Sequence, residues 1–228
     1  MSVISKIAGL FSKTTQKSGN NRPDFFRSLE AAEQGDASAQ YNIGVMYDTG
    51  QGVVKDAAEA AKWFRKAAEQ GIAGAQYNLG YAYAKGEGVT KNEAEAVKWY
   101  LKAAERGLAN AQHNLGNMYA NGRGTAKDEA EAVRWYRKAA EQGLAHAQNN
   151  IGLMYAKGQG VTKDDAEAAK WFIKAADQEN RDAQFNLGIM YIHGVGVQCD
   201  SGKARFWLMK SAQLGHKQAA ELLKSMQA

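Results

Sequence analysis

Residues 73–107 read AGAQYNLGYAYAKGEGVTKNEAEAVKWYLKAAERG, and the same pattern recurs along most of the chain. All the tryptophans occupy one position of this pattern at a constant step of 36 residues: Trp63, Trp99, Trp135, Trp171 and Trp207. Asn78, Gly80 and Tyr83 recur with the same step. No insertion or deletion breaks the register over five copies, so the chain is an array of tandem units.

Each unit is predicted to form two helices joined by a glycine-rich turn. In the copy quoted above, the first helix is expected over residues 73–85 and the second over residues 93–106. Gly86 is expected to close the first helix in the left-handed conformation. Asn92 precedes the second helix and Glu95 follows three residues later, a spacing that resembles a capping box.

The second helix is expected to end at a glycine in the left-handed conformation. Three copies carry this glycine after EQ or ER: Gly71, Gly107 and Gly143. The fifth copy has Glu179 and Asn180 there instead. Asn180 is expected to supply the left-handed conformation, because asparagine tolerates it better than most residues.

The predicted fold class is an all-α solenoid of five full helix–turn–helix units plus capping helices. One unit cannot bury both faces of its helices, so stacked neighbours form a continuous core. Residues 23–34 are expected to form a shortened second helix, and residues 216–228 to begin a sixth first helix. We expect a single repeat domain over residues 23–228, preceded by a distinct segment, residues 1–22.

Residues 73–107 resemble the Sel-one-like repeat, a relative of the tetratricopeptide repeat. The resemblance covers about residues 35–228 and implies a right-handed superhelical scaffold that gathers partner proteins. It also implies roles in signalling, protein quality control and bacterial interactions with hosts or competitors. Secreted cysteine-rich relatives carry a disulfide in each repeat, whereas this chain has only Cys199.

Positions that differ between copies are free of scaffold constraints and are candidates for partner contact. On the first helix these positions fall three or four residues apart and form one stripe, which the resemblance places on a concave groove. The recurring asparagine lies beside the stripe. The predicted partner-binding residues are Tyr41, Asn42, Tyr77, Asn78, Tyr81, Lys85, His113, Asn114, Asn117, Asn149, Asn150, Leu153, Phe185, Asn186 and Ile189.

Two interpretations of these residues stay open. An asparagine amide both donates and accepts, so a ladder of asparagines suits an extended peptide. The same amides equally suit hydrogen bonds within the scaffold, because buried amides need partners. The aromatic positions are candidates for gripping partner side chains, or for packing between adjacent first helices.

Catalytic and metal-binding functions find no support in the sequence. Gly86 and Gly88 follow a predicted helix and no Gly-Lys-Ser/Thr occurs, which argues against a phosphate-binding loop. The four histidines lack the HxxxH spacing of a zinc hydrolase. We therefore predict a protein that is not an enzyme and needs no cofactor or metal. A weak β-lactam hydrolase, as proposed for cysteine-rich relatives, stays a remote alternative.

The charge distribution excludes nucleic-acid binding by the repeat region of the chain. Four of the 29 basic residues lie in residues 1–22, which hold no acid. The remaining 206 residues carry 25 basic and 24 acidic side chains and lack the basic stripe of a nucleic-acid binder. Residues 1–17 are either a basic amphipathic segment that touches an anionic membrane or a groove, or a disordered leader.

The predicted function is a non-enzymatic scaffold or adaptor that binds a partner protein or peptide in its concave groove. The alternative is a bacterial immunity protein that neutralises one toxin. One cysteine, no apolar stretch of membrane-spanning length and no secretory signal make a cytoplasmic location the expectation. The sequence leaves the partner and the oligomeric state undefined.

Overall fold

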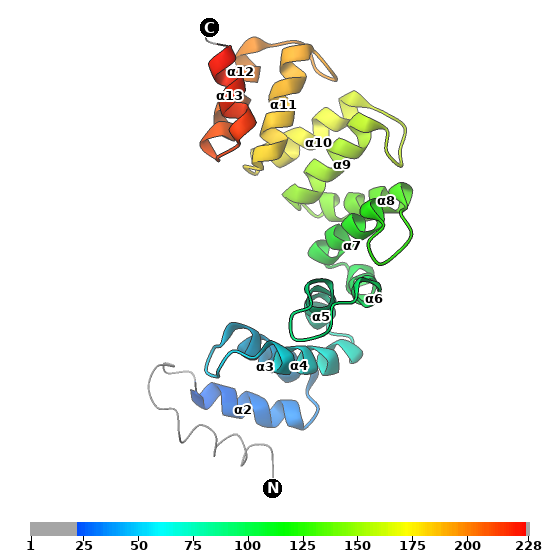
Figure 1. Ribbon diagram of the computed structural model, residues 1–228, viewed down its shortest axis with the longest axis vertical. Helices are drawn as coiled ribbons and strands as arrows, with labels where there is room; N and C mark the ends of the chain where they lie inside the picture. The colour runs from blue at the N-terminus through cyan, green and yellow to red at the C-terminus, as the bar shows by residue number, and fades with distance from the viewer. Residues whose placement is uncertain (1–21, 227–228) are drawn as a thin grey trace. The chain divides into compact units, whose positions relative to one another are not determined.

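The computed structural model describes residues 22–226. These residues form helices α2 to α13, joined by turns, and contain no strand (Figure 1). The predicted all-α solenoid of helix–turn–helix units is thereby confirmed. The chain divides into two compact units, Met1–Arg106 and Gly107–Ala228. The hypothesis of a membrane-binding, groove-binding or disordered segment over residues 1–17 lies outside the described residues.

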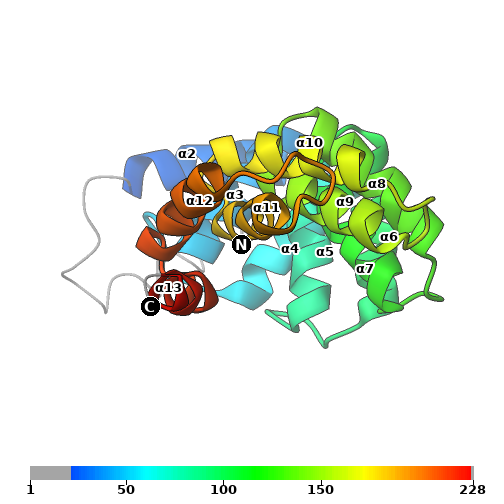
Figure 2. The same ribbon diagram turned by 90° about the horizontal axis from the view of Figure 1, so that it is seen from above.

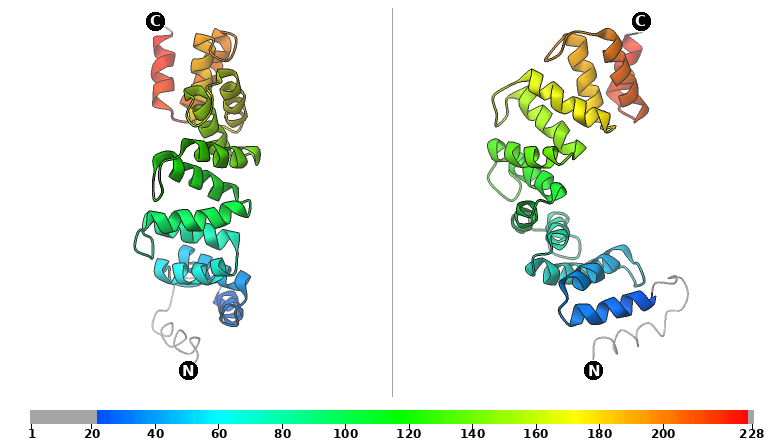
Figure 3. Two further views of the ribbon diagram at one scale, coloured as in Figure 1. Left: turned by 90° about the vertical axis from the view of Figure 1, so that its right-hand side faces the viewer. Right: turned by 180° about the vertical axis from the view of Figure 1, so that it is seen from behind.

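The first unit contains five helices, each packed against the next along the chain (Figure 3). They are α2 (Arg22–Glu33), α3 (Ala37–Thr49), α4 (Ala57–Glu69), α5 (Ala73–Lys85) and α6 (Glu93–Glu105). The predicted bounds of α2, α5 and α6 are confirmed to within one residue. Phe25 and Leu29 of α2 are buried, so this shortened second helix closes the end of the core.

The second unit continues the same alternation of first and second helices (Figure 2). Its helices are α7 (Ala109–Asn121), α8 (Glu129–Glu141), α9 (Ala145–Lys157), α10 (Asp165–Asp177), α11 (Arg181–His193), α12 (Ser201–Gln213) and α13 (Lys217–Ser225). As expected, α13 is a shortened sixth first helix, and Ala219 is its buried contact.

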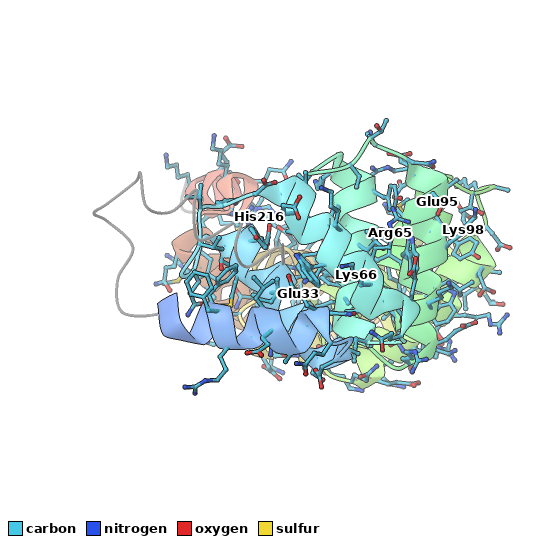
Figure 4. All side chains as sticks on the ribbon, turned by 90° about the horizontal axis from the view of Figure 1, so that it is seen from below. Glu33, Arg65, Lys66, Glu95, Lys98 and His216 are labelled. Carbon is cyan, nitrogen blue, oxygen red and sulfur yellow. The ribbon has the colours of Figure 1, made fainter. Side chains whose placement is uncertain are left out.

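The second helices begin at capped residues, and half of the predicted capping box is confirmed. The side chain of Asn92 accepts the backbone N–H of Glu95 at 3.1 Å. The N–H of Asn92 itself donates to the carbonyl of Tyr83 at 2.9 Å, so Glu95 does not take the reciprocal role. Glu95 instead pairs with Lys98 at 2.6 Å on the outer side of α6 (Figure 4).

The prediction for Asn180 is wrong. Glu179 takes the left-handed conformation, with φ of 61°, at the position where the other copies have glycine. Asn180 has φ of −69° and caps α11, accepting the N–H of Ala183 at 2.9 Å. The equivalent helices α5, α7 and α9 begin at Ile72, Leu108 and Leu144 without a side-chain cap, so the Asn180 cap is an addition particular to this repeat.

The repeated glycine of the first helix is a point of close helix contact. A Cβ atom added at Gly80 would lie 2.8 Å from the ring of Tyr100, and one at Gly116 would lie 2.7 Å from the ring of Tyr136. These distances are below any normal carbon–carbon contact, so only glycine lets the two helices of one repeat pack this closely.

The tryptophans of the first four copies are buried in the core, with 6–8% of each side chain exposed. The lysine three residues later lies over each indole ring, with Nζ to ring-centre distances between 3.9 and 4.3 Å. In the fifth copy Trp207 is only half-buried, because α12 has a shortened neighbour. The prediction of a continuous core made by stacking is confirmed within each unit.

A row of buried glutamines joins consecutive repeats, and the sequence analysis missed it. Nε2 of Gln40, Gln76, Gln148 and Gln184 donates to the backbone carbonyl of the alanine eight residues earlier, always at 3.1 Å. Oε1 accepts Nε2 of a second glutamine thirty residues later in the pairs Gln40–Gln70, Gln112–Gln142 and Gln148–Gln178, always at 2.8 Å. The signal was present, because these glutamines recur every 36 residues.

Candidate partner-binding surface

The predicted partner-binding residues lie on the first helices of each of the two units, and the surface that they form on a unit is called its first-helix face. In the first unit this face is carried by α3 and α5. Asn42, Tyr81 and Lys85 are exposed there, while Tyr41, Tyr77 and Asn78 are half-buried. The fraction of Tyr81 that remains exposed is 39%, which is large for a tyrosine in a helical array.

Tyr41 and Tyr77 also have packing roles. The Tyr41 ring centre lies 6.0 Å from that of Phe64, and a Cβ atom added at Gly74 would lie 3.1 Å from the Tyr41 ring. Tyr77 packs in the same way against Tyr100, with ring centres 5.8 Å apart. For these two rings the packing interpretation is supported, and their exposed edges alone are free for a partner.

Tyr81 and Asn78 face a small cavity between α4 and α5, which we call the α4–α5 notch. Its volume is about 60 Å³, enough for the end of one side chain. Ala57, Ala60, Ala61, Phe64 and Ala82 provide its apolar surface, and Asp48, Asn78, Tyr81 and Glu87 provide its polar groups. Among the described residues, the Asn78 side chain has no hydrogen-bond partner, so its amide is available to a ligand.

In the second unit, His113 lies in a network of amides on the first-helix face. The amide of Asn150 donates to Nε2 of His113 at 3.1 Å and to Oδ1 of Asn117 at 3.3 Å. The hydroxyl of Tyr136 donates to the same Oδ1 at 2.7 Å. Asn114 is half-buried on the same helix. Two predicted asparagines, Asn117 and Asn150, therefore lie within hydrogen-bond distance of His113.

Burial shifts the titration of two groups in this network. Burial, and secondarily the neighbouring His146, lowers the pKa of His113 to about 4. Burial raises the pKa of the Tyr136 hydroxyl to about 12. Both groups are therefore neutral at physiological pH, and the network offers hydrogen bonds without charge.

The remaining predicted residues of the second unit lie on α9 and α11. Asn149 is buried, with 7% exposed, and its Oδ1 accepts the amide of Asn186 at 3.3 Å. Phe185 stacks on His216, with ring centres 4.3 Å apart. Leu153 and Ile189 are half-buried on the same helices. Of this group, Asn149 is the one that the structure places in the interior.

The asparagine ladder divides into two kinds. Asn150 and Asn186 donate to a polar residue of the preceding first helix, His113 and Asn149 respectively. For Asn78, the residue at the equivalent position of the preceding first helix is Tyr41, and the ring of Tyr41 packs on Phe64. The scaffold interpretation thus describes Asn150 and Asn186, whereas Asn42 and Asn78 keep side-chain amides without partners among the described residues.

The described residues contain no group of three or more His, Cys, Asp or Glu side chains placed to hold a metal ion. Cys199 is exposed, and its thiol donates to the carbonyl of Ile192 at 3.4 Å. No helix within residues 22–226 has the length and apolar character needed to cross a bilayer.

Comparison with protein families identifies five consecutive matches to the Sel1 repeat, at residues 37–72, 73–108, 109–144, 145–180 and 181–216. The chain belongs to the Sel1 repeat family. Each matched repeat begins at a first helix and ends beyond the following second helix. Sel1 repeat proteins generally mediate protein–protein interactions, and the Sel1 repeat scaffold is generally non-enzymatic.

Two solved structures of Sel1 repeat proteins are similar to this Sel1 repeat chain. One is a protective antigen of uropathogenic Escherichia coli with an SLR fold, at 44% identity and a TM-score of 0.85. That match covers 89% of this chain but only 43% of the E. coli chain. The other is a Sel1 repeat protein from Oxalobacter formigenes, at 39% identity and a TM-score of 0.78, covering 90% of this chain and 87% of that one.

A more distant likeness concerns the fold alone. An immunity protein from Pseudomonas aeruginosa matches 88% of the chain at 20% identity and a TM-score of 0.51, covering 84% of its own length. At this identity the two proteins share the Sel1 repeat architecture and not a demonstrated activity. No curated protein matches the chain significantly.

Proposed function

We propose that this Sel1 repeat chain is a non-enzymatic scaffold that binds a partner protein or peptide on its first-helix face. The observation that carries the proposal is the pair Asn78 and Tyr81 beside the α4–α5 notch. Neither the amide of Asn78 nor the exposed part of Tyr81 is used in stacking the repeats. Exposed aromatic and amide groups beside a cavity are typical of a contact surface.

The proposal includes the sequence-based expectations of a single repeat domain over residues 23–228 and a cytoplasmic location. It assigns partner contact to residues of the first-helix face that reach the surface. Asn149 is left out because its side chain is buried. His113, Asn117 and Asn150 are half-buried, and they act as a neutral patch whose amides are already oriented by one another.

The test captures partners from native lysate on three immobilised full-length chains. The first is the unaltered chain, and the second carries Asn78→Ala and Tyr81→Ala. The control carries Phe206→Lys and Met209→Arg on α12, where both side chains are exposed. These substitutions introduce residues that the first repeat has at the equivalent positions, Lys62 and Arg65. Circular dichroism verifies that all three chains are folded.

A partner recovered by the unaltered chain is then purified and its affinity measured by calorimetry. We expect the control to bind it normally and the Asn78/Tyr81 variant to bind at least about tenfold more weakly, as loss of a contact cluster requires. Equal affinity for both variants would overturn the proposal. A one-to-one complex with a single toxin would identify the neutralising alternative.

A further inference from the structure

The α4–α5 notch exists because two small residues stand where the other repeats have larger ones. Ala82 occupies the position of Met46, Met118, Met154 and Met190, and the last three of these methionines are buried with 4–7% exposed. Ala57 occupies the position of Glu93, Glu129 and Asp165. The fold therefore tolerates larger side chains at both positions.

The notch also carries an acidic pair that the scaffold does not require. Asp48 stands where the following three repeats have alanine, and Glu87 stands where the later repeats have Arg123, Gln159 and Val195. Both carboxylates line the notch. Neither forms an ion pair with another residue of the described range 22–226. Two uncompensated carboxylates at an apolar opening attract a cation.

The third feature is an aromatic wall. Tyr81 lines the notch with 39% of its side chain exposed. The ammonium of Lys85 lies 5.9 Å from the Tyr81 ring centre, at the outer limit of a cation–π contact. Tyr81 thus gives the notch an aromatic side chain beside the two carboxylates.

We infer that the α4–α5 notch binds a basic side chain, lysine or arginine, of the partner polypeptide. Ala60, Ala61 and Phe64 receive the methylene groups, because long basic side chains bury their stems on apolar surfaces. Asp48 and Glu87 pair with the charged end. The Asn78 amide is placed to hydrogen-bond the partner's backbone. This inference rests on the proposed function and specifies which partner residue the surface selects.

The inference is tested with two small probes on the isotope-labelled full chain. They are N-acetyl-lysine methylamide and N-acetyl-norleucine methylamide, which have similar stems but differ in charge. Chemical shifts are followed at the Asn78 amide and the Ala82 methyl group. We expect the lysine probe to bind at least about fivefold more tightly than the norleucine probe, the gain of one ion pair or cation–π contact.

Two variants taken from the chain's own repeats give the matched controls. Ala82→Met introduces the residue of four other repeats and fills the notch, and it should abolish the shifts that either probe causes at the Asn78 amide. Asp48→Ala with Glu87→Gln keeps the cavity but removes the charge, and should reduce the preference for lysine to about one. Equal binding of the two probes to the unaltered chain, or no binding, overturns the inference, as does binding that survives Ala82→Met.

The result of this probe experiment does not depend on the result of the capture experiment. The probes need no partner, and the charge variants leave Asn78 and Tyr81 in place. A chain that loses its partner through Asn78→Ala and Tyr81→Ala, yet shows no preference for lysine over norleucine, retains the proposed function and loses only the basic-residue specificity.

Discussion

At the scale of single residues, His113 is the most strongly perturbed side chain of the first-helix face. Its ring centre lies 5.9 Å from that of Tyr136 and 6.3 Å from that of His146, and Nε2 accepts the amide of Asn150. A proton added at Nε2 would break this hydrogen bond and place a charge in a poorly solvated site. The neutral ring is therefore part of the folded network.

We predict a pKa of about 4 for His113 in the folded chain, against an ordinary value of 6.5. Proton NMR of the imidazole over pH 3 to 8 measures it directly. His146 is exposed and serves as the internal comparison in the same spectra. A midpoint near 6.5 for His113 would show that its ring is solvated.

The lowered pKa also makes stability depend on pH. Protonation favours the unfolded state, so the contribution of His113 is complete above about pH 6.5 and is lost as the pH falls towards 4. The loss amounts to at most about 3 kcal/mol. His113→Asn, which copies Asn149 at the equivalent position, should flatten the urea-measured stability between pH 6.5 and 4 relative to the unaltered chain.

The backbone of Glu179 is strained, because its φ is 61° at a position where the other repeats have glycine. We predict that Glu179→Gly raises the free energy of unfolding by about 1 kcal/mol, because the left-handed conformation costs a non-glycine residue about that much. Urea denaturation measures the gain. The reverse change Gly143→Glu should lower stability by a similar amount, and an unchanged midpoint in both variants would contradict the strain.

At the scale of helices, the contact at the repeated glycine sets the spacing between the two helices of one repeat. We predict that Gly116→Ala lowers the free energy of unfolding by about 1 to 2 kcal/mol. The added methyl group would lie 2.7 Å from the Tyr136 ring, and overpacking of this kind outweighs the better helix propensity of alanine. Chemical denaturation of the two chains measures the difference.

Gly202 provides the matched control on α12. A Cβ atom there would meet only Asp200 Oδ1, at 3.4 Å, which is ordinary contact. Gly202→Ala should therefore stabilise the chain by up to about 1 kcal/mol through helix propensity alone. If both alanine variants shifted stability in the same direction, close packing at Gly116 would not be the reason for its glycine.

The helices themselves were predictable because their signals are local. Asn92 and Gly86 mark helix ends through their own side-chain and backbone chemistry, so the bounds of α5 and α6 followed from the sequence to within one residue. The exchange of roles between Glu179 and Asn180 was not predictable, because two adjacent residues competed for one turn. The partner of each buried glutamine depends on a residue thirty positions away, which periodicity alone does not identify.

At the scale of the whole molecule, position within the array should determine what a core residue contributes. We predict that Trp135→Ala costs about 3–5 kcal/mol, as expected for a buried aromatic side chain. Trp207→Ala should cost less, because Trp207 is half-buried near the end of the repeats. Denaturant unfolding of both variants provides the comparison, and equal losses would contradict a stability that sums over neighbours.

The candidate surface was less predictable than the array. Helical spacing placed the predicted residues on the first helices, but it could not separate Asn149, which is buried, from Asn42, which is exposed. That difference depends on the neighbouring repeat: Asn149 is covered where Asn186 approaches it. The α4–α5 notch was also missed, because it results from two small side chains, Ala57 and Ala82, on different helices.

The glutamine row has a consequence for how such a chain changes in length. Gln148 and Gln184 bond to alanine carbonyls at identical offsets, eight residues back in each case. Removing residues 145–180 would bring Gln184 to the carbonyl of Ala140, an acceptor equivalent to the one it lost. Recombination that removes or adds 36 residues thus joins compatible repeat surfaces without compensating substitutions. Selection can therefore change the length of the array by adding or removing whole repeats.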